Sequence, residues 1–150
     1  MFATKEKLQP AQHAPEKITV LVVSPHHDDH NVVRRLLQNG HWEVVRAANL
    51  REAYEEIELA NPAVIVCERD LPDGTWRDVL RTVSEIKPSP SVIVTSRHAD
   101  ETLWADVLNS GGYDVLPKPF DRSEAIRVLG MAWRYACGLR RRPAMATSAF

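Results

Sequence analysis

The sequence contains few cysteines, no long apolar segment and almost no net charge. Cys67 and Cys137 are its two cysteines, and they show neither metal-ligand spacing nor a disulfide framework. No apolar run reaches the ~18 residues of a membrane helix, and the N-terminus lacks the pattern of a secretory signal. The 19 basic and 20 acidic residues leave a net charge of -1, which excludes bulk attraction to nucleic acid or an anionic membrane. We therefore expect a cytoplasmic protein that binds neither.

The 150 residues suit one domain with a sizeable core, flanked by two polar segments. Residues 1–16 have no apolar periodicity and are interpreted as a flexible arm. Residues 17–137 form the predicted domain. Residues 138–150 are interpreted as a basic tail that is too short for an output domain, so a stand-alone protein is expected.

Within the domain, short runs of β-branched residues alternate with segments of helical apolar spacing. This order predicts repeated βα units around a parallel sheet that is covered on both faces. Strands are predicted at about 18–23, 42–47, 63–67, 91–95 and 113–116, and helices at about 26–39, 49–60, 75–86, 99–110 and 121–137.

Several helix boundaries have a physical cause in the sequence. Ser24-Pro25 is expected to cap and begin the first helix, and Asn39-Gly40 to end it with a left-handed residue. Asn61-Pro62 is expected to end the second helix, because a residue that precedes proline avoids the helical region. Asp121 or Ser123 can cap the last helix.

Four motifs follow the predicted strands in chain order. Ser24-Pro25 follows the first strand, and the segment 68–74, Glu-Arg-Asp-Leu-Pro-Asp-Gly, follows the third. Thr95 ends the fourth strand, and Lys118-Pro119-Phe120 follows the fifth. Ligands of open parallel sheets bind beyond the carboxyl ends of the strands, where all four motifs are expected to lie.

Over residues 17–137 these motifs resemble the receiver (CheY-like) domain of bacterial two-component response regulators. The resemblance implies a flavodoxin-like, doubly wound (βα)5 three-layer sandwich with a five-stranded parallel sheet of order 2-1-3-4-5. It also implies that Thr95 and Lys118 form the phosphate pocket, that Lys118-Pro119 is a cis peptide, and that position 68 is the phosphoacceptor.

The sequence departs from the family at the residues that carry the chemistry. Glu68 replaces the phosphoacceptor aspartate, and Ser24 and Pro25 replace the acid pair that holds a divalent metal. Phosphoryl transfer to a carboxylate needs that metal, and the metal needs hard oxygen ligands. Glu68 and the backbone carbonyl of Asp70 are the oxygens that remain, so we expect no cofactor, with Mg²⁺ binding weak or lost, and no enzymatic activity.

Glu68 is one methylene longer than aspartate, which moves its carboxylate outward by about 1.5 Å. It could therefore reach Thr95 and Lys118 and imitate part of a phosphoaspartate, fixing the domain in one state. A simple semi-buried ion pair of Glu68 with Lys118 is the alternative. Val115 occupies the position where the family often has a switching aromatic ring, which also favours a fixed state.

His26, His27, Asp28, Asp29 and His30 form a cluster at the start of the first helix. His26 and His30 share a helical face and could bind a transition metal with a nearby carboxylate. The cluster is more simply an exposed first turn, with the acids complementing the helix dipole and the histidines facing water. Asp28 could also replace the lost acid pair, although it is expected to lie one turn away from the pocket.

The face made by the fourth helix, fifth strand and fifth helix is the expected partner surface. Trp104, Leu108 and Val115 are its predicted contacts for a homodimer, and Trp133 is a candidate anchor or a core residue. The predicted function is a phosphorylation-independent protein-interaction module in signal transduction, with a histidine kinase, phosphotransfer or output protein as partner. A degenerate but functional phosphoacceptor and a metal-binding protein built on the histidines are the alternatives.

Overall fold

The computed structural model describes residues 17–141 except Asn39. Outside this part lie the predicted arm, most of the predicted tail and one of the two residues that were expected to end the first helix. Its central sheet consists of β1 (Ile18–Val23), β2 (Trp42–Ala47), β3 (Val64–Glu68), β6 (Ser91–Ser96) and β7 (Asp114–Pro117). The helices are α2 (His27–Leu36), α3 (Leu50–Ala60), α4 (Trp76–Val83), α5 (Glu101–Asn109) and α6 (Arg122–Arg141).

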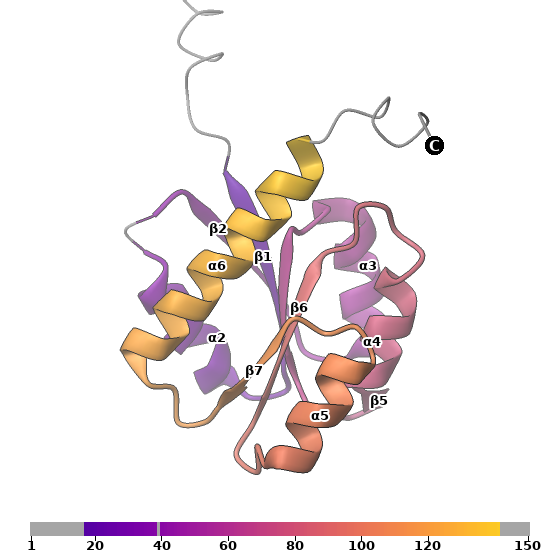
Figure 1. Ribbon diagram of the computed structural model, residues 1–150, viewed down its shortest axis with the longest axis vertical. Coiled ribbons are helices and arrows are strands. Elements are labelled where there is room, and N and C mark those ends of the chain that lie inside the picture. Colours follow the sequence, from indigo (N-terminus) through magenta and orange to yellow (C-terminus); the bar gives the residue numbers. More distant parts are fainter. Residues whose placement is uncertain (1–16, 39, 142–150) are drawn as a thin grey trace, which may run out of the picture.

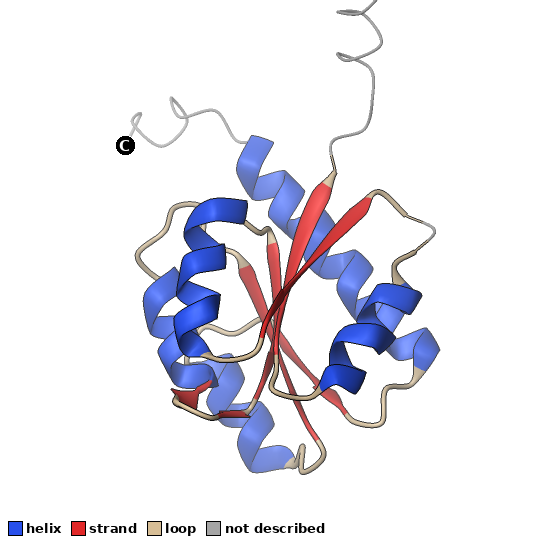
Figure 2. Cartoon of the chain, turned by 180° about the vertical axis from the view of Figure 1, so that it is seen from behind, coloured by secondary structure: helices blue, strands red, loops and turns tan. Residues whose placement is uncertain are grey.

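The five strands are parallel, in the order β2-β1-β3-β6-β7. This is the predicted order 2-1-3-4-5 of the doubly wound α/β fold, which is confirmed. Helices α2 and α6 cover one face of the sheet, and α3, α4 and α5 cover the other (Figures 1 and 2). The three layers place every strand's carboxyl end at the same edge of the sheet.

The strand sequences explain why the sheet is central. Along β1, Leu21 and Val23 pack into the core beneath α3, α4 and α5, whereas Val20 and Val22 pack beneath α2 and α6. Successive side chains of a strand point to opposite faces, so a run that is apolar at every position must be covered on both sides. The edge strand β2 is more exposed than β1, and its sequence is correspondingly more polar.

Most predicted boundaries lie within a few residues of the observed ones. Asn61 ends α3 in the left-handed region (φ 48°), and the Asp121 carboxylate accepts a hydrogen bond from the Glu124 amide at the start of α6. The Lys118-Pro119 peptide is cis, as the resemblance implied. The last helix continues through Arg141, four residues beyond its predicted end.

The predicted cap of the first helix is wrong, and its predicted left-handed end at Asn39-Gly40 is tested only at Gly40, because Asn39 lies outside the described residues. The helix begins at His27, and its N-cap is His26, whose side chain makes no capping bond; Ser24 therefore does not cap it. Gly40 is not left-handed, because Gly111 is the only described glycine with positive φ. The helix ends earlier than predicted, at Leu36, with Leu37 as its C-cap.

A short antiparallel hairpin, β4 (Asp70–Leu71) and β5 (Gly74–Thr75), follows β3 and was not predicted. Its Thr75 begins α4 with a capping box, in which Asp78 accepts a hydrogen bond from the Thr75 amide. The Asp73 carboxylate at the hairpin tip accepts hydrogen bonds from the Leu50 and Arg51 amides at the start of α3. The hairpin therefore joins the segment after Glu68 to two helices.

Among the residues that the structure describes, no helix is long and apolar enough to cross a membrane.

Candidate functional site

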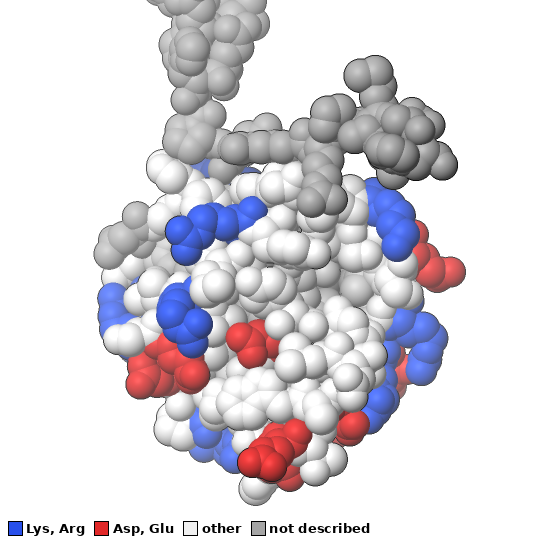
Figure 3. Space-filling view, viewed as in Figure 1, with Lys and Arg blue, Asp and Glu red and all other residues white. Residues whose placement is uncertain are grey.

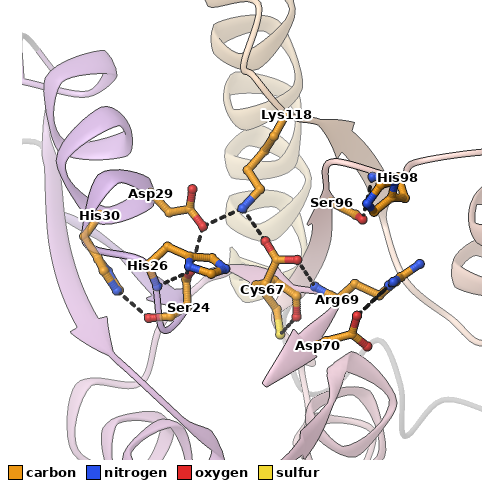
Figure 4. A network of polar contacts seen from close by, with 11 residues as sticks. Ser24, His26, Asp29, His30, Cys67, Arg69, Asp70, Ser96, His98 and Lys118 are labelled. Atoms are coloured by element: carbon orange, nitrogen blue, oxygen red, sulfur yellow. Dashed lines mark hydrogen bonds and ion pairs between the residues drawn. The ribbon is translucent and has the colours of Figure 1, made fainter. Parts of the chain in front are cut away.

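The predicted site residues meet at the carboxyl edge of the sheet. Ser24 follows β1, Glu68 ends β3, Thr95 lies opposite Glu68 on β6, and Lys118 follows β7. All four are buried or nearly so, and a network of polar contacts connects most of this region (Figure 4). The four motifs therefore lie together at one edge of the sheet, as their positions after the strands predicted, and this buried polar cluster is called the pocket below.

Lys118 lies at the centre of the pocket, between two carboxylates. Its ammonium forms an ion pair with Glu68 Oε1, and its Nζ is also 2.8 Å from Asp29 Oδ2. The side chains of Lys118, Glu68 and Asp29 are 5%, 9% and 11% exposed. Such burial makes the loss of one partner costly, because the remaining buried charges are then incompletely paired and have little access to water.

Asp29 is the member of this buried cluster that the sequence did not predict there. It lies in the first turn of α2, and its Oδ2 accepts a 2.6 Å hydrogen bond from the Ser24 hydroxyl. Asp28, proposed from the sequence as a replacement acid, is exposed instead. A signal for Asp29 was present, since it lies four and eight residues before the buried Val33 and Leu37 and so shares their face of the helix.

Ser24 is a connector between the strand and the helix rather than a helix cap. Its hydroxyl donates to Asp29 and also accepts a 3.0 Å hydrogen bond from the His26 amide. Its backbone carbonyl lies 2.8 Å from His30 Nε2. Pro25 is exposed and offers no side-chain ligand, so the two residues that follow β1 contribute no negative charge.

The second oxygen of Glu68 faces the backbone. Glu68 Oε2 accepts a 3.1 Å hydrogen bond from the Arg69 amide, and that amide also donates to the Thr95 carbonyl at 2.9 Å. In the described part of the chain, no hydrogen bond joins the Thr95 hydroxyl to Glu68. The glutamate thus reaches Lys118, as predicted, and lies beside Thr95 on the neighbouring strand without a hydrogen bond to its hydroxyl.

The histidine cluster divides into exposed and buried members. His26 and His27 are exposed, whereas His30 is buried, contrary to the expectation that all the histidines face water. Burial lowers the pKa of His30, with the positive charge of Arg46 adding to the effect. No group of three potential metal ligands among histidine, cysteine and acidic side chains occurs in the described ranges. His30 therefore lies beside Ser24 in the pocket wall, whereas His26 and His27 belong to the solvent-exposed surface.

Two neighbours of Glu68 are not reactive groups of the pocket. Burial raises the pKa of the Cys67 thiol, and the adjacent Glu68 charge adds to the shift. The Asp70 carboxylate is exposed and pairs with the Arg69 guanidinium at 2.9 Å. The Cys67 side chain therefore contributes no thiolate at neutral pH, and the Asp70 carboxylate is held by Arg69 at the surface.

The pocket does not fit the divalent metal that the resemblance implies. A magnesium site uses one or two carboxylates with several waters in an octahedron. Here both buried carboxylates are engaged by the Lys118 ammonium, and the residues after β1 are Ser24 and Pro25. The donor set that would hold the ion is thus occupied by a side chain of the protein itself.

The predicted partner face corresponds to α5, β7 and α6. Leu108 is 52% exposed there, and Trp104 is half-buried with its Nε1 donating to Asp114 Oδ1 at 3.1 Å. Val115 is 1% exposed, so the prediction that it contacts a partner is wrong: it points into the core beneath the α5 side. Trp133 packs against Trp42 with ring centroids 5.9 Å apart, near the opposite edge of the sheet.

This face carries additional exposed apolar residues on α6. Tyr135 is 54% exposed and its ring packs, tilted, against Tyr113 of the chain segment before β7, and Met131, one turn earlier on the same side of the helix, is 45% exposed. Figure 3 shows a broad uncharged area on this side of the molecule, with most charged side chains toward its rim and a small acidic patch near its middle. Exposed apolar surface of this kind is typical of an interaction site.

Comparison with known proteins agrees with this architecture. The family model "Response regulator receiver domain" matches residues 20–129. No match was found among curated protein sequences. A signal receiver domain of an HD domain-containing protein from Pseudomonas fluorescens Pf-5 is 21% identical, with a TM-score of 0.78, and the match covers 87% of this chain and 96% of that one.

Two further solved structures are similar. The chemotaxis response regulator CheY4 of Vibrio cholerae is 21% identical with a TM-score of 0.69, covering 77% of this chain and 98% of that one. The beryllofluoride-activated NtrC4 receiver domain, described as a dimer, is 25% identical with a TM-score of 0.72, covering 79% and 98%. With the sheet order, the pocket at the carboxyl edge and the family match over most of its length, the chain belongs to the response regulator receiver domain family of two-component signalling.

Proposed function

We propose that this receiver domain is a phosphorylation-independent protein-interaction module, in which Glu68 replaces the phosphoacceptor aspartate. One observation carries the proposal: the Glu68 carboxylate is ion-paired with Lys118, and Asp29 holds the same ammonium. The lysine that would bind an incoming phosphoryl group is thus already engaged by permanent negative charge. The Glu68 carboxylate thus gives Lys118 a negative partner, as a phosphoaspartate would, although no phosphoryl transfer has taken place.

The extra methylene of glutamate supports this reading. It lets the carboxylate contact Lys118 directly while its other oxygen accepts a hydrogen bond from the Arg69 amide. Val115 is buried and has no ring that could rotate between an inward and an outward position. Glu68 carries its negative charge without a phosphoryl group that could be removed, and Val115 has no aromatic ring that could change position. Both features favour a partner surface that stays in one conformation.

The proposed partner is a protein: a histidine kinase, a phosphotransfer protein, an output protein or a second copy of this chain. The candidate contact surface is the α5-β7-α6 face, with Trp104, Leu108 and Tyr135 as its apolar centre. Aromatic residues are enriched at binding hot spots, and Trp104 is oriented by its bond to Asp114. Val115 is not included in this surface, because its side chain is buried.

The competing function is a degenerate phosphoacceptor that still works in a phosphorelay. The buried Thr95 and Lys118 favour it, because both phosphate-pocket residues are retained beside the acceptor position. It requires a metal to enter a pocket whose two buried carboxylates are paired with lysine. That requirement is the reason we rank it second.

Intact mass after incubation with acetyl phosphate and Mg²⁺ separates the two functions. The unmodified chain should gain no phosphoryl mass. A variant that carries Glu68→Asp, Ser24→Asp and Pro25→Asp should gain one, because it regains the acceptor and the acid pair. Glu68→Gln on the restored acid pair is the matched control, and it should stay unmodified. A phosphoryl adduct on the unmodified chain would exclude the proposed function.

A further inference from the structure

A cleft of about 380 Å³ lies at the amino edge of the sheet, at the end opposite to Glu68 and Lys118. It is formed by residues 89–91 at the start of β6, the turn 111–113 before β7, and Tyr135 and Leu139 of α6. Among the described residues that line this amino-edge cleft, none is charged. Its volume falls in the range of small-molecule sites, which is roughly 300–1,000 Å³.

Hydrogen bonds outside the amino-edge cleft hold its walls in place. Arg140, next to Leu139, donates from Nη2 to the backbone carbonyls of Asn61 and Pro62 at 3.1 and 3.0 Å, which fixes the end of α6 against the segment before β3. The Ser89 hydroxyl donates to the Ile86 carbonyl at 2.7 Å and so fixes the chain that enters β6. The cleft is therefore preformed, as binding sites for small molecules usually are.

Ser91 places an unpaired hydroxyl at the floor of the cleft. Its side chain is on the same face of β6 as the buried Ile93, because side chains alternate along a strand, and this face is covered by α6. Ser91 is only 6% exposed, yet no described residue forms a hydrogen bond with its Oγ. A buried hydroxyl without a partner is unfavourable, so a ligand that supplies a hydrogen bond here gains binding energy.

The wall opposite this floor is aromatic. The rings of Tyr113 and Tyr135 pack with their centroids 5.8 Å apart and their planes tilted by 42°, and Tyr135 remains 54% exposed. Aromatic rings favour offset or edge-to-face contact with further rings, so the exposed side of Tyr135 suits a flat aromatic group. The uncharged lining gives a charged ligand no counter-ion, and desolvating such a ligand would be costly.

We propose that the amino-edge cleft binds a small uncharged aromatic molecule, whose ring packs against Tyr135 and whose hydroxyl or ring N–H forms a hydrogen bond with Ser91 Oγ. The floor supplies the polar contact that orients the ligand, and the tyrosine supplies apolar contact area. The cleft is separate from the pocket around Lys118. Its ligand binding therefore does not depend on whether the chain accepts a phosphoryl group.

Phenol is the probe, since it is uncharged at neutral pH and combines one ring with one hydroxyl. Titration of the ¹⁵N-labelled full chain with phenol should give saturable shifts of the backbone amides of residues 91, 111–113 and 139, without shifts around Lys118. Toluene has nearly the same shape but no hydroxyl, and it should bind about threefold or more weakly, the loss expected for one hydrogen bond. Benzoate, which is charged, should give no saturable shifts.

Variants separate the contribution of the hydroxyl from that of the ring. Ser91→Ala should weaken phenol binding about threefold or more and leave toluene binding unchanged, because it removes the hydrogen bond alone. Tyr135→Ala should weaken the binding of both molecules, because it removes the aromatic wall. Tyr54→Ala is the matched control: that tyrosine is also partly exposed, but it lies on α3, on the other face of the sheet, and the variant should bind as the unmodified chain does.

The ligand-free melting temperature checks the state of the hydroxyl independently. Ser91→Ala should melt at the same temperature as the unmodified chain or higher, since it removes an unpaired buried group. A lower melting temperature would show that Ser91 has a partner within the protein and would count against the site. Absence of saturable shifts with phenol, shifts confined to other parts of the chain, saturable binding of benzoate, or unchanged phenol affinity in Ser91→Ala or Tyr135→Ala would each overturn the proposal.

Discussion

Asp29 Oδ2 and Lys118 Nζ lie 2.8 Å apart although 89 positions separate them in the sequence. The contact connects α2 on one side of the pocket to the segment after β7 on the other, with Glu68 of β3 between them. Three elements of the carboxyl edge are thus held by one buried charge cluster.

Asp29→Asn should destabilise the fold by about 1–3 kcal/mol, because the buried lysine loses one of its two counter-charges while the side-chain volume stays the same. Asp28→Asn, at the exposed neighbouring position, should change the free energy of unfolding by less than about 0.5 kcal/mol. Urea unfolding of the three proteins at neutral pH measures the difference. Equal stability of Asp29→Asn and the unmodified chain would mean that Lys118 is satisfied by Glu68 alone.

Stability should fall as the pH decreases below about 6.5, partly because of His30. Burial lowers the pKa of His30 in the folded state from its ordinary value of 6.5, so the unfolded chain binds a proton that the folded chain resists. The contribution of His30 to stability is complete above 6.5 and is lost as the pH falls toward its folded pKa.

The histidine effect is isolated by comparing variants at two pH values. Urea unfolding at pH 7.5 and pH 5.5 should show a smaller pH difference for His30→Gln than for the unmodified chain. His26→Gln changes an exposed histidine of the same cluster and should keep the full difference. An unchanged difference in His30→Gln would assign the pH effect to other groups.

Leu108→Asp should weaken self-association or partner binding through the α5-β7-α6 face, because it places a charge in the centre of an apolar contact surface. Leu59→Asp is the matched control: that leucine is 80% exposed, but it lies on α3, which covers a different part of the molecule. Sedimentation velocity across a concentration series measures the effect on self-association. An equal response of both variants would mean that this face is not the contact surface.

Cys67 should not react with a thiol reagent in the folded protein. Its side chain is fully buried, and its raised pKa leaves almost no thiolate at pH 8. Labelling with Ellman's reagent should therefore detect at most one thiol, that of the half-buried Cys137, until denaturant is added. Cys67→Ala should leave native labelling unchanged, whereas reduced labelling would show that the pocket opens beside Glu68.

Much of the fold follows from the order of local patterns. Continuous β-branched runs such as residues 18–23 can be stable only when both faces are covered, and the helical segments between them must then cross over the sheet. The carboxyl ends of the strands consequently lie at one edge of the sheet, which brings Glu68 and Lys118 close together. The hairpin after β3 was missed because its two-residue strands are too short to give a periodic pattern.

The sequence by itself determined the doubly wound sheet and predicted that Glu68, at the end of β3, reaches Lys118, since both depend on spacing along the chain. The tertiary structure decided that an acid of α2 reaches Lys118, because that contact depends on how the helix packs on the sheet. The face of α2 that carries Val33 and Leu37 packs inward and brings Asp29 with it, which leaves Asp28 in solvent. It also decided that Val115 is core, because the side of a strand that a helix covers depends on packing between elements far apart in sequence.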